Sequence, residues 1–370
     1  METLRILWMN WKCIKHPEAG GAEIYTHEVA KRLVKMGHEV TLLTSSFPGA
    51  KSKEIIDGYT VLRAGNRFTV YIRAREIYEK MFKGKVDVVI DEINTLPFFT
   101  VKYVRENVVA LIHQLAREYW FYETPLPLSI IGYFLEPRYL KLYRKYPTIT
   151  VSNSTKEDLK RLGFENIYIV PPGVSLKPLS SIPVKNKEPT IIFIGRLKKA
   201  KRPQHVIKAF NILRRKIKNA KLWIVGRGPL ETKLFRITRK LHLENSVKFW
   251  GRVDDKTKLD LLRKSHVLMN TSIREGWGLV VLEAYTQATP VVAYNVPGIR
   301  DSVKNLRTGI LVESGNVSSL ADVLLHLLEN ESLRKFLARN ALNFVKQFSW
   351  DHTAAKINDY LSKGIHLYNR

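Results

Sequence analysis

Short apolar runs alternate with amphipathic stretches along most of the chain. The apolar runs have roughly the four to eight residues that are typical of buried strands. The stretches between them repeat their apolar residues at the spacing of helices that cover a sheet. The predicted strands are residues 4–9, 39–44, 60–63, 86–91, 108–112, 148–152, 168–170, 190–194, 221–225, 246–250, 266–269 and 290–293. The predicted helices are residues 23–36, 71–82, 129–146, 203–218, 257–264, 279–287, 318–329, 332–347 and 351–362.

This alternation predicts an α/β protein with parallel sheets and helices on both faces of each sheet. Residues 175–189 interrupt the pattern, because they are polar, rich in proline and without periodicity, as linkers are. We therefore predict two doubly wound, Rossmann-like domains facing across a cleft. The N-terminal domain is expected at 1–174, the linker at 175–189 and the C-terminal domain at 190–349.

Composition narrows the class of protein. A chain of 370 residues with 45% hydrophobic residues is long enough for two folded cores. Its single cysteine, Cys13, can form no internal disulfide and no cysteine-based zinc site, which fits a reducing compartment. The sequence shows no apolar run of membrane-spanning length, and its first residues already read as a strand. We therefore expect a cytoplasmic protein.

The charge is strongly positive, with 61 Lys and Arg against 34 Asp and Glu, for a formal net charge of +27. Such a balance favours nucleic acid, an anionic lipid surface or phosphorylated small molecules as partners. Aromatic and aliphatic residues at 119–135 precede basic residues at 138–145. This combination suits a peripheral membrane contact. A core helix with a solvated basic edge is the alternative.

Several glycine-bearing loops follow predicted strands, where open α/β sheets bind their ligands. Gly20 and Gly21 precede the first long helix and suit an anion at a helix N-terminus, although a plain turn has the same composition. Arg196 and Lys201 follow a buried strand and could clamp a diphosphate, or could form a solvated basic loop. The turns at 226–229 and 250–255 could offer backbone groups to a base or ribose.

Two further strand ends carry polar side chains. His113 follows the strand at 108–112, where a structural histidine and a functional one are both open. Asp91 and Glu92 are adjacent carboxylates, but no Asp-x-Asp motif is present, so we expect no metal. The sequence also contains no nucleophile elbow, P-loop or His-Glu-x-x-His motif.

Residues 270–293 form the most informative stretch, a predicted strand, glycine-containing loop, helix and second strand. Glu275 lies in the loop, and Glu283 lies on the otherwise apolar helix. A carboxylate there is costly unless it is paired or contacts a ligand. A helix-capping glutamate and a surface glutamate are the structural alternatives.

Taken in order, these motifs resemble those of glycosyltransferase family 4, the retaining nucleotide-sugar transferases of GT-B fold. The resemblance covers nearly the whole chain and implies that the last helix, in residues 350–370, crosses back to the N-terminal domain. The matching motifs are Gly20-Gly-Ala-Glu23, His113, Pro171-Pro-Gly-Val174, Phe193-Ile-Gly-Arg-Leu197 with Lys201, Gly226-Arg-Gly-Pro229, Glu275-Gly-Trp-Gly-Leu279 with Glu283-Ala284, and Phe348-Ser-Trp350.

The chain departs from the family pattern at two places. Ala288 stands where the family usually has glycine, which is a small-for-small change. Residues 296–301, with the sequence Val-Pro-Gly-Ile-Arg-Asp, replace a Gly-Gly-x-x-Glu loop. In the family this loop lies near the donor sugar, so the identity of the sugar stays open.

The resemblance implies roles for particular residues. Catalytic roles fall on His113, Arg196, Lys201 and Glu275. Donor nucleotide and phosphate binding falls on Gly20, Gly21, Gly195, Arg196, Lys201, Gly226, Gly228, Arg252, Val253, Leu279, Val280 and Glu283. Donor sugar binding falls on His113, Glu275, Gly276, Trp277 and Gly278. No metal and no other cofactor is expected, because Arg196 and Lys201 would neutralise the diphosphate.

The expected activity is retaining transfer of a hexose, of mannose or glucose type, from a nucleotide sugar to a glycan or lipid-linked acceptor at the cytosolic membrane face. Val253-Asp-Asp-x-x-Lys258 resembles segments of some family enzymes that use GDP-mannose, with a UDP-hexose as the alternative donor. Three other functions are open: a transferase with a soluble acceptor, a non-catalytic nucleotide-sugar sensor and a basic nucleic-acid-binding protein. No recognised nucleic-acid module supports the last.

Overall fold

The computed structural model describes residues 3–368, with side chains to residue 362, as two compact α/β units. The N-terminal unit contains the chain up to Arg117, then Ile130–Gly173, and then the chain from Phe348 onward. The C-terminal unit contains Glu118–Ser129 and Val174–Gln347. The short segment Glu118–Ser129, which we expected within residues 1–174, therefore packs with the C-terminal unit.

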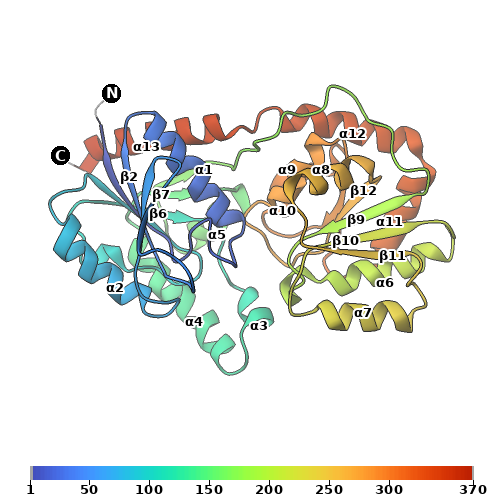
Figure 1. Ribbon diagram of the computed structural model, residues 1–370, viewed down its shortest axis with the longest axis horizontal. Helices are drawn as coiled ribbons and strands as arrows, with labels where there is room; N and C mark the ends of the chain where they lie inside the picture. Colours follow the sequence, from blue (N-terminus) through green and yellow to red (C-terminus); the bar gives the residue numbers. More distant parts are fainter. Residues whose placement is uncertain (1–2, 369–370) are drawn as a thin grey trace. The chain divides into compact units, whose positions relative to one another are not determined.

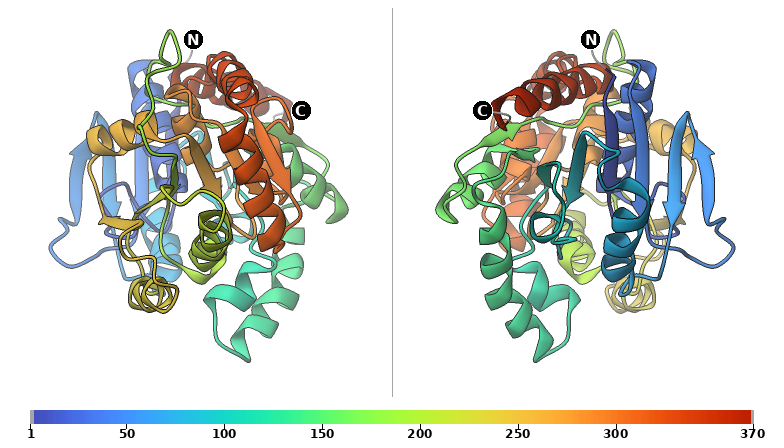
Figure 2. Two further views of the ribbon diagram at one scale, coloured as in Figure 1. Left: turned by 90° about the vertical axis from the view of Figure 1, so that its right-hand side faces the viewer. Right: turned by 90° about the vertical axis from the view of Figure 1, so that its left-hand side faces the viewer.

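The sheet of the N-terminal unit has eight strands in the order β3-β4-β2-β1-β5-β6-β7-β8. All neighbours are parallel except β3 and β4, whose hairpin is drawn in light blue at the outer edge of the sheet (Figure 2). The order reverses at β1, because β2 and β5 lie on its two sides. The strands are β1 (Arg5–Met9), β2 (Glu39–Thr44), β3 (Lys53–Ile56), β4 (Tyr59–Arg63), β5 (Val88–Glu92), β6 (Asn107–Ile112), β7 (Thr148–Thr150) and β8 (Ile167–Ile169).

Helices cover this sheet through two apolar clusters. In one, Leu7 and Met9 of β1 pack against Val70 and Tyr78, at the α2 side of the sheet. In the other, strand residues such as Ala110 pack against α4 and α5. The helices are α1 (Gly21–Lys35), α2 (Val70–Ile77), the π-helical turn η1 (Tyr78–Phe82), α4 (Leu128–Leu140), α5 (Asn153–Arg161) and α13 (Trp350–Tyr368), with short 3-10 turns at Thr100–Lys102 and Lys141–Tyr143.

The last helix, α13, packs on the N-terminal unit beside α1, which confirms the predicted return of the chain (Figure 1). Arg32 Nε donates to Asp351 Oδ1 at 2.6 Å. Tyr168 and Tyr360 stack with their ring centroids 4.7 Å apart. His38, which is buried, accepts the backbone N–H of Leu4 through Nδ1 at 3.1 Å. Its Nε2 lies 2.7 Å from Asn358 Oδ1.

The sheet of the C-terminal unit has six parallel strands in the order β11-β10-β9-β12-β13-β14. The order reverses beside β9, because β10 and β12 flank it. Helices α6 and α7 lie on one face and α8 and α9 on the other (Figure 1). The strands are β9 (Thr190–Ile194), β10 (Lys221–Val225), β11 (Val247–Gly251), β12 (Val267–Asn270), β13 (Val291–Tyr294) and β14 (Gly309–Val312). The helices are α3 (Tyr119–Glu123), the 3-10 turn η4 (Lys199–Lys201), α6 (Pro203–Arg214), α7 (Glu231–Lys240), α8 (Asp255–Lys264), α9 (Leu279–Thr286), α10 (Ile299–Ser302), α11 (Val317–Glu329) and α12 (Glu331–Val345).

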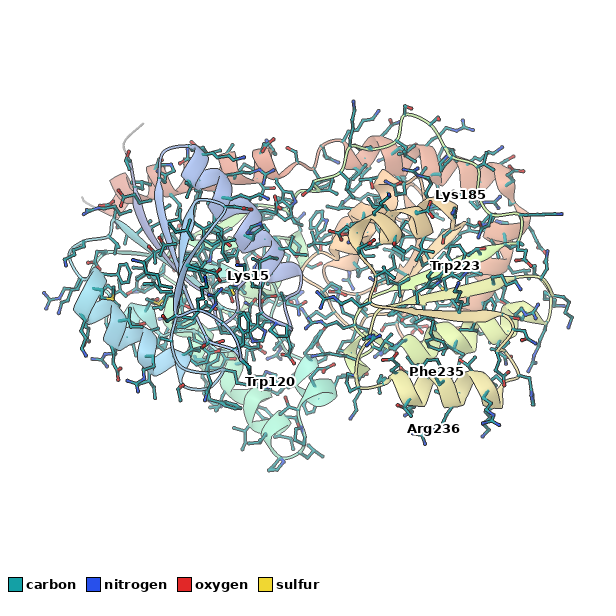
Figure 3. The ribbon with its side chains drawn as sticks, in the orientation of Figure 1. Lys15, Trp120, Lys185, Trp223, Phe235 and Arg236 are labelled. Carbon is teal, nitrogen blue, oxygen red and sulfur yellow. The ribbon has the colours of Figure 1, made fainter. Side chains whose placement is uncertain are left out.

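The stretch 175–189 is ordered along the C-terminal unit. Leu179 N donates to Thr286 O at 2.9 Å, and Asn186 N donates to Lys264 O at 3.0 Å. Lys185, labelled in Figure 3, donates to Thr289 Oγ1 at 2.9 Å. Burial, together with the charge of Arg334, lowers the pKa of Lys185 to about 7. These contacts hold residues 175–189 against the ends of α8 and α9 and the residues that precede β13.

Replacing Asn358 by alanine tests the docking of α13. Because His38 Nδ1 accepts the N–H of Leu4, Nε2 is the ring nitrogen that donates a hydrogen bond to Asn358 Oδ1. Asn358→Ala leaves this buried donor without that acceptor, and we expect a loss of about 1–3 kcal/mol in unfolding free energy. Urea unfolding measures it, with Asn343→Ala on the exposed face of α12 as the control. Equal stability of both variants would show that the contact does not hold α13.

Candidate active site

The carboxyl ends of β9 and β12 form the point where the strand order of the C-terminal unit reverses. Open α/β sheets bind ligands at such points. The loop after β9 carries Lys201, and the loop after β12 carries Glu275. Lys201 Nζ donates to Glu275 Oε1, and Ser272 Oγ donates to the same oxygen at 2.6 Å. Two residues far apart in the sequence, both predicted for the site, are therefore in direct contact.

The environment of Lys201 favours the charged form of its side chain. Burial acts to lower its pKa, but the charge and hydrogen bond of Glu275 act in the opposite direction, and the pKa of Lys201 is raised from its ordinary value. The lysine side chain is 21% exposed and that of Glu275 14% exposed. A fixed positive charge that is shielded from water binds an anion more strongly than an exposed one.

Arg196 lies on the same loop as Lys201, directly after β9, and is exposed. The loop is fixed by backbone hydrogen bonds, since Gly195 N donates to Val225 O at 3.0 Å and Leu197 N donates to Arg227 O at 2.9 Å. An exposed guanidinium on a fixed loop can bind a phosphate without a change in the backbone.

Gly226 and Gly228, predicted to face the nucleotide, allow strand-end loops to pack closely. Gly226 has φ +130°, and a Cβ there would lie 2.0 Å from Gly195 O. A Cβ on Gly228 would lie 2.6 Å from Leu197 O. Both glycines therefore bring the turn after β10 against the loop that carries Arg196. This role is structural; nucleotide contact at these positions stays a prediction.

Glu283 lies on α9 and is paired with Lys258 of α8, at 2.7 Å between Oε1 and Nζ. This explains how a carboxylate is kept on an apolar helix. The preceding loop contains Arg252, which is exposed, and Val253, which is half-buried. Asp254 caps α8 by accepting the N–H of Thr257 at 2.7 Å. The motif from Val253 to Lys258 is thus a helix start that supplies the partner of Glu283.

The loop Gly276-Trp277-Gly278 leads into α9, whose first residues are Leu279 and Val280. The first-turn N–H groups of a helix have no acceptor within the helix and suit an anion or a hydroxyl. Pro297 O accepts the N–H of Glu275 at 3.1 Å, and a Cβ on Gly298 would lie 1.9 Å from Glu275 O. The unusual loop 296–301 therefore packs on the backbone that presents Glu275.

In the N-terminal unit, Gly20 and Gly21 begin α1 at the reversal point beside β1. Gly21 is exposed. The carboxylate of Glu23 accepts the N–H of Gly20 at 2.5 Å and lies 3.3 Å from Lys12 Nζ. Lys12 is buried and also donates to Glu18 O at 2.9 Å. This lysine, which sequence analysis did not identify, fixes the loop in front of α1.

His113 follows β6 and contacts the buried Glu92, with 3.0 Å between Nε2 and Oε1. The other oxygen of Glu92 accepts Trp8 Nε1 at 2.7 Å and Thr26 Oγ1 at 2.5 Å. The ring of Tyr25 lies edge-on to His113, with centroids 5.1 Å apart. His113 is thus oriented by a fully hydrogen-bonded carboxylate, as functional histidines commonly are.

The pair Asp91 and Glu92 does not form a common ligand set. Glu92 binds Trp8, Thr26 and His113, whereas Asp91 accepts from Tyr143 and from Thr100, at 2.5 and 2.8 Å. Burial raises the pKa of Asp91 above its ordinary value. Among the described residues, no group of three or more His, Cys, Asp or Glu is arranged to hold a metal ion.

Sequence analysis also missed contacts from Glu118–Glu123, which lie beside the loops of Lys201 and Glu275. Periodicity had assigned these residues to the N-terminal domain. The sequence marks Lys258 only as part of the Val253–Lys258 motif, because its pairing with Glu283 depends on how α8 and α9 pack. Each of these partners comes from a different segment of the chain, so spacing along the sequence carried no signal.

Two Rossmann-like units with largely parallel sheets, each with a reversal point in its strand order, have the architecture of the GT-B fold. The family model described as Glycosyltransferase Family 4 matches residues 19–177, and the model described as Glycosyl transferases group 1 matches residues 179–344. The chain belongs to glycosyltransferase family 4.

Three known proteins illustrate the similarity. N-acetyl-alpha-D-glucosaminyl L-malate synthase of Bacillus anthracis is 26% identical over 349 residues, covering 88% of this chain and 89% of that protein. Phosphatidyl-myo-inositol mannosyltransferase of Mycobacterium leprae is 26% identical over 356 residues, covering 91% of each chain. The structure of sucrose-phosphate synthase from Thermosynechococcus elongatus has a TM-score of 0.82 at 18% identity, covering 97% of this chain and 98% of that chain.

Removing either cation tests the phosphate-binding role. We expect Arg196→Ala and Lys201→Ala each to lower kcat by about 10²–10³, the effect of losing a charge that stabilises the transition state. Lys199→Ala, an exposed residue of the same turn, is the control and should retain wild-type turnover. Steady-state kinetics with the preferred donor measure the effect. Unchanged kcat in Arg196→Ala and Lys201→Ala would remove both residues from the mechanism.

Replacing the two glutamates separates their roles. Glu275→Gln should reduce sugar transfer much more than binding of the free nucleotide, because Glu275 is predicted to hold the sugar. Glu283→Gln should weaken binding of the free nucleotide by about tenfold, the usual effect of losing a hydrogen bond from a charged group. Calorimetric titration and transfer assays on both variants measure this. If the two variants show the reverse pattern, the roles must be exchanged.

Proposed function

We propose that this glycosyltransferase moves a hexose, of mannose or glucose type, from a nucleoside diphosphate sugar to a glycan or lipid-linked acceptor. The transfer proceeds with retention of configuration and without a metal ion. One observation carries the proposal: Lys201 and Glu275 form a shielded ion pair at the reversal point, with Arg196 exposed on the same loop. Two cations suit a diphosphate, and a carboxylate beside them suits sugar hydroxyls.

The cations of this loop assist departure of the nucleotide. As the bond between the anomeric carbon and the phosphate oxygen breaks, negative charge develops on the diphosphate. Arg196 and Lys201 stabilise that charge, which is the part a divalent metal plays in other transferases. Glu283, held by Lys258, binds ribose hydroxyls, and the N-terminus of α9 assists Glu275 in holding the sugar.

The resemblance to glycosyltransferase family 4 implies retention, and the pairing of the carboxylates favours a same-face substitution over a covalent intermediate. Glu275 and Glu283 are each held by a lysine, which suits hydroxyl binding rather than attack on the anomeric carbon. In the proposed course, the acceptor oxygen bonds to the anomeric carbon on the face from which the diphosphate leaves. The acceptor proton passes to the departing phosphate oxygen. The roles of Gly20, Gly21 and His113 toward the donor stay predictions.

The names of the relatives support two kinds of acceptor. The Mycobacterium leprae relative is named a phosphatidyl-myo-inositol mannosyltransferase, which favours mannose and a lipid acceptor. The Bacillus anthracis relative is named N-acetyl-alpha-D-glucosaminyl L-malate synthase, which supports the alternative of a soluble acceptor. The resemblance of Val253–Lys258 to segments of GDP-mannose enzymes gives GDP-mannose the first place among donors.

A thermal-shift screen of UDP, GDP, ADP and their sugars tests the proposed donor. A ligand that binds only the folded state raises apparent stability. We expect GDP-mannose or a UDP-hexose to give the largest rise, and transfer with that donor to be unaffected by EDTA. A rise with none of these compounds would contradict the proposed function. Activity lost with EDTA and restored by Mg²⁺ or Mn²⁺ would refute the metal-free mechanism alone.

Helix α4 supports a membrane-surface acceptor. Its apolar side chains Leu128, Ile130, Ile131, Phe134 and Leu135 are between 44% and 60% exposed. Arg138 and Lys141 follow in sequence. Exposed aliphatic and aromatic groups beside basic ones bind anionic membranes by adding apolar and electrostatic attraction. None of the helices within residues 3–368 has the length and apolar content of a membrane span.

Sedimentation with anionic vesicles tests this surface. At low salt we expect the protein to sediment with phosphatidylglycerol vesicles, and the double variant Ile131→Glu with Phe134→Glu to remain in the supernatant. Phe336→Glu, on the exposed side of α12, is the matched control and should sediment as wild type does. Sedimentation of the double variant at the wild-type level would exclude α4 as the membrane contact.

A further inference from the structure

Helix α3 (Tyr119–Glu123) is held on the C-terminal unit by polar contacts. None of its residues is fully buried, although Tyr119, Trp120 and Tyr122 are half-buried. It lies beside η4, the turn that contains Lys201. Its contacts with the loops of Lys201 and Glu275 come from residues that the proposed mechanism does not use.

Glu118 connects this segment to the loop of Glu275. Arg274 Nε donates to Glu118 Oε2 at 3.0 Å, and the arginine side chain is 7% exposed. Arg274 directly precedes Glu275, so the position of Glu118 bears on the backbone that presents the carboxylate. A charge-assisted hydrogen bond to a largely buried arginine is stronger than an exposed ion pair.

Tyr122 and Glu123 connect the segment to the loop of Lys201. Glu123 Oε1 accepts the N–H of Ala200 at 3.0 Å, and its Oε2 lies 3.9 Å from Lys198 Nζ. Arg202 Nη2 donates to the hydroxyl of Tyr122 at 2.7 Å. Ala200 and Arg202 are the neighbours of Lys201 on either side. The backbone next to the lysine is therefore fixed by α3.

Tyr119 is the first residue of α3 and lies in the sequence between Glu118 and Tyr122. It is half-buried, and burial raises the pKa of its phenol. The charges of Lys201 and Arg196 act to lower this pKa, and the charge of Glu275 acts to raise it. Tyr119 belongs to α3, which contacts the turn that carries Lys201. A tyrosine hydroxyl can donate to a phosphate oxygen or to a sugar hydroxyl.

We propose that the segment Glu118–Glu123 is part of the donor site. Glu118 and Glu123 are positioning residues that fix the loops of Glu275 and Lys201 relative to each other. Tyr119 contacts the bound donor where the diphosphate joins the sugar. The inference rests on the proposed function, and it adds a donor-contacting residue that the family motifs of this chain do not contain.

The same contacts also fit a segment that blocks the donor site, and the experiment must distinguish the two cases. The carboxylate of Glu118 pairs with Arg274. The carboxylate of Glu123 accepts the N–H of Ala200 and lies near Lys198 Nζ. If the segment Glu118–Glu123 instead blocked the empty site, the donor diphosphate would compete with the two carboxylates for these basic and N–H groups. If the segment positions the loops, removing its carboxylates weakens donor binding. If the segment blocks the site, removing them strengthens donor binding.

The test compares Glu118→Gln, Glu123→Gln, Tyr119→Phe and the control Glu157→Gln, whose ion pair with Lys160 on α5 is exposed. The probes are UDP, GDP, UDP-glucose and GDP-mannose, titrated by calorimetry, together with kcat and KM for the active donor. We expect Tyr119→Phe to weaken the sugar nucleotide by about tenfold and the free nucleotide by less than about twofold, since one hydrogen bond to a charged group is lost.

Glu118→Gln and Glu123→Gln should each raise the donor KM and Kd by about threefold to tenfold, while Glu157→Gln leaves both unchanged. Each glutamine variant replaces an exposed carboxylate by an amide of the same shape, so we expect it to fold as the wild type does. The unfolding midpoint of each variant checks this. Wild-type donor affinity in Tyr119→Phe, Glu118→Gln and Glu123→Gln would overturn this inference. The proposed function would stand if substitution of Lys201 and Glu275 still impaired the enzyme. Tighter donor binding in Glu118→Gln and Glu123→Gln would show that the segment blocks the empty site, which would also overturn this inference. Binding of none of the probes by the wild type would reject both proposals.

Discussion

The contact between Lys201 and Glu275 is the interaction on which the site depends. It joins the loop after β9 to the loop after β12, two strands that are neighbours only because the sheet order reverses there. Backbone contacts accompany it, since Ile273 N donates to Ala200 O at 2.9 Å and Thr271 Oγ1 donates to Lys201 O at 2.8 Å. A charged pair shielded from water needs such support, because its desolvation is costly unless both partners are held in place.

Other features of the C-terminal unit serve the same geometry. Gly226 and Gly228 allow the turn after β10 to support the loop of Arg196, and Gly298 allows loop 296–301 to support Glu275. Lys258 neutralises Glu283 on α9. The segment Glu118–Glu123, which is not part of the family motifs, adds contacts to the loops of Lys201 and Glu275. The site therefore consists of strand-end loops whose backbones are fixed by one another, which is the preorganisation that electrostatic catalysis requires.

The fold was largely predictable, because buried parallel strands are apolar runs that periodicity detects. Strands β3 and β14 were not predicted: β3 is half charged and lies at an edge, and β14 is a four-residue run after a turn. The residues that follow buried strands, such as Arg196 and Glu275, were also predictable. Lys12, Lys258 and Glu118 were not, because each acts through a partner from another element. The expected single helix 129–146 ends at Leu140 and continues as a 3-10 turn, with Pro137 inside it.

The central claim is that Lys201 and Glu275 act as one unit in binding the donor. A double-mutant cycle with Lys201→Met, Glu275→Gln and the combined variant tests it most directly, with the affinity for the preferred nucleotide sugar as the readout. Residues that act as a unit are strongly non-additive. We predict that each single variant loses most of the affinity and that the combined variant loses little more than the weaker-binding single variant. Wild-type affinity in all three variants, or losses that add in full, would contradict the account.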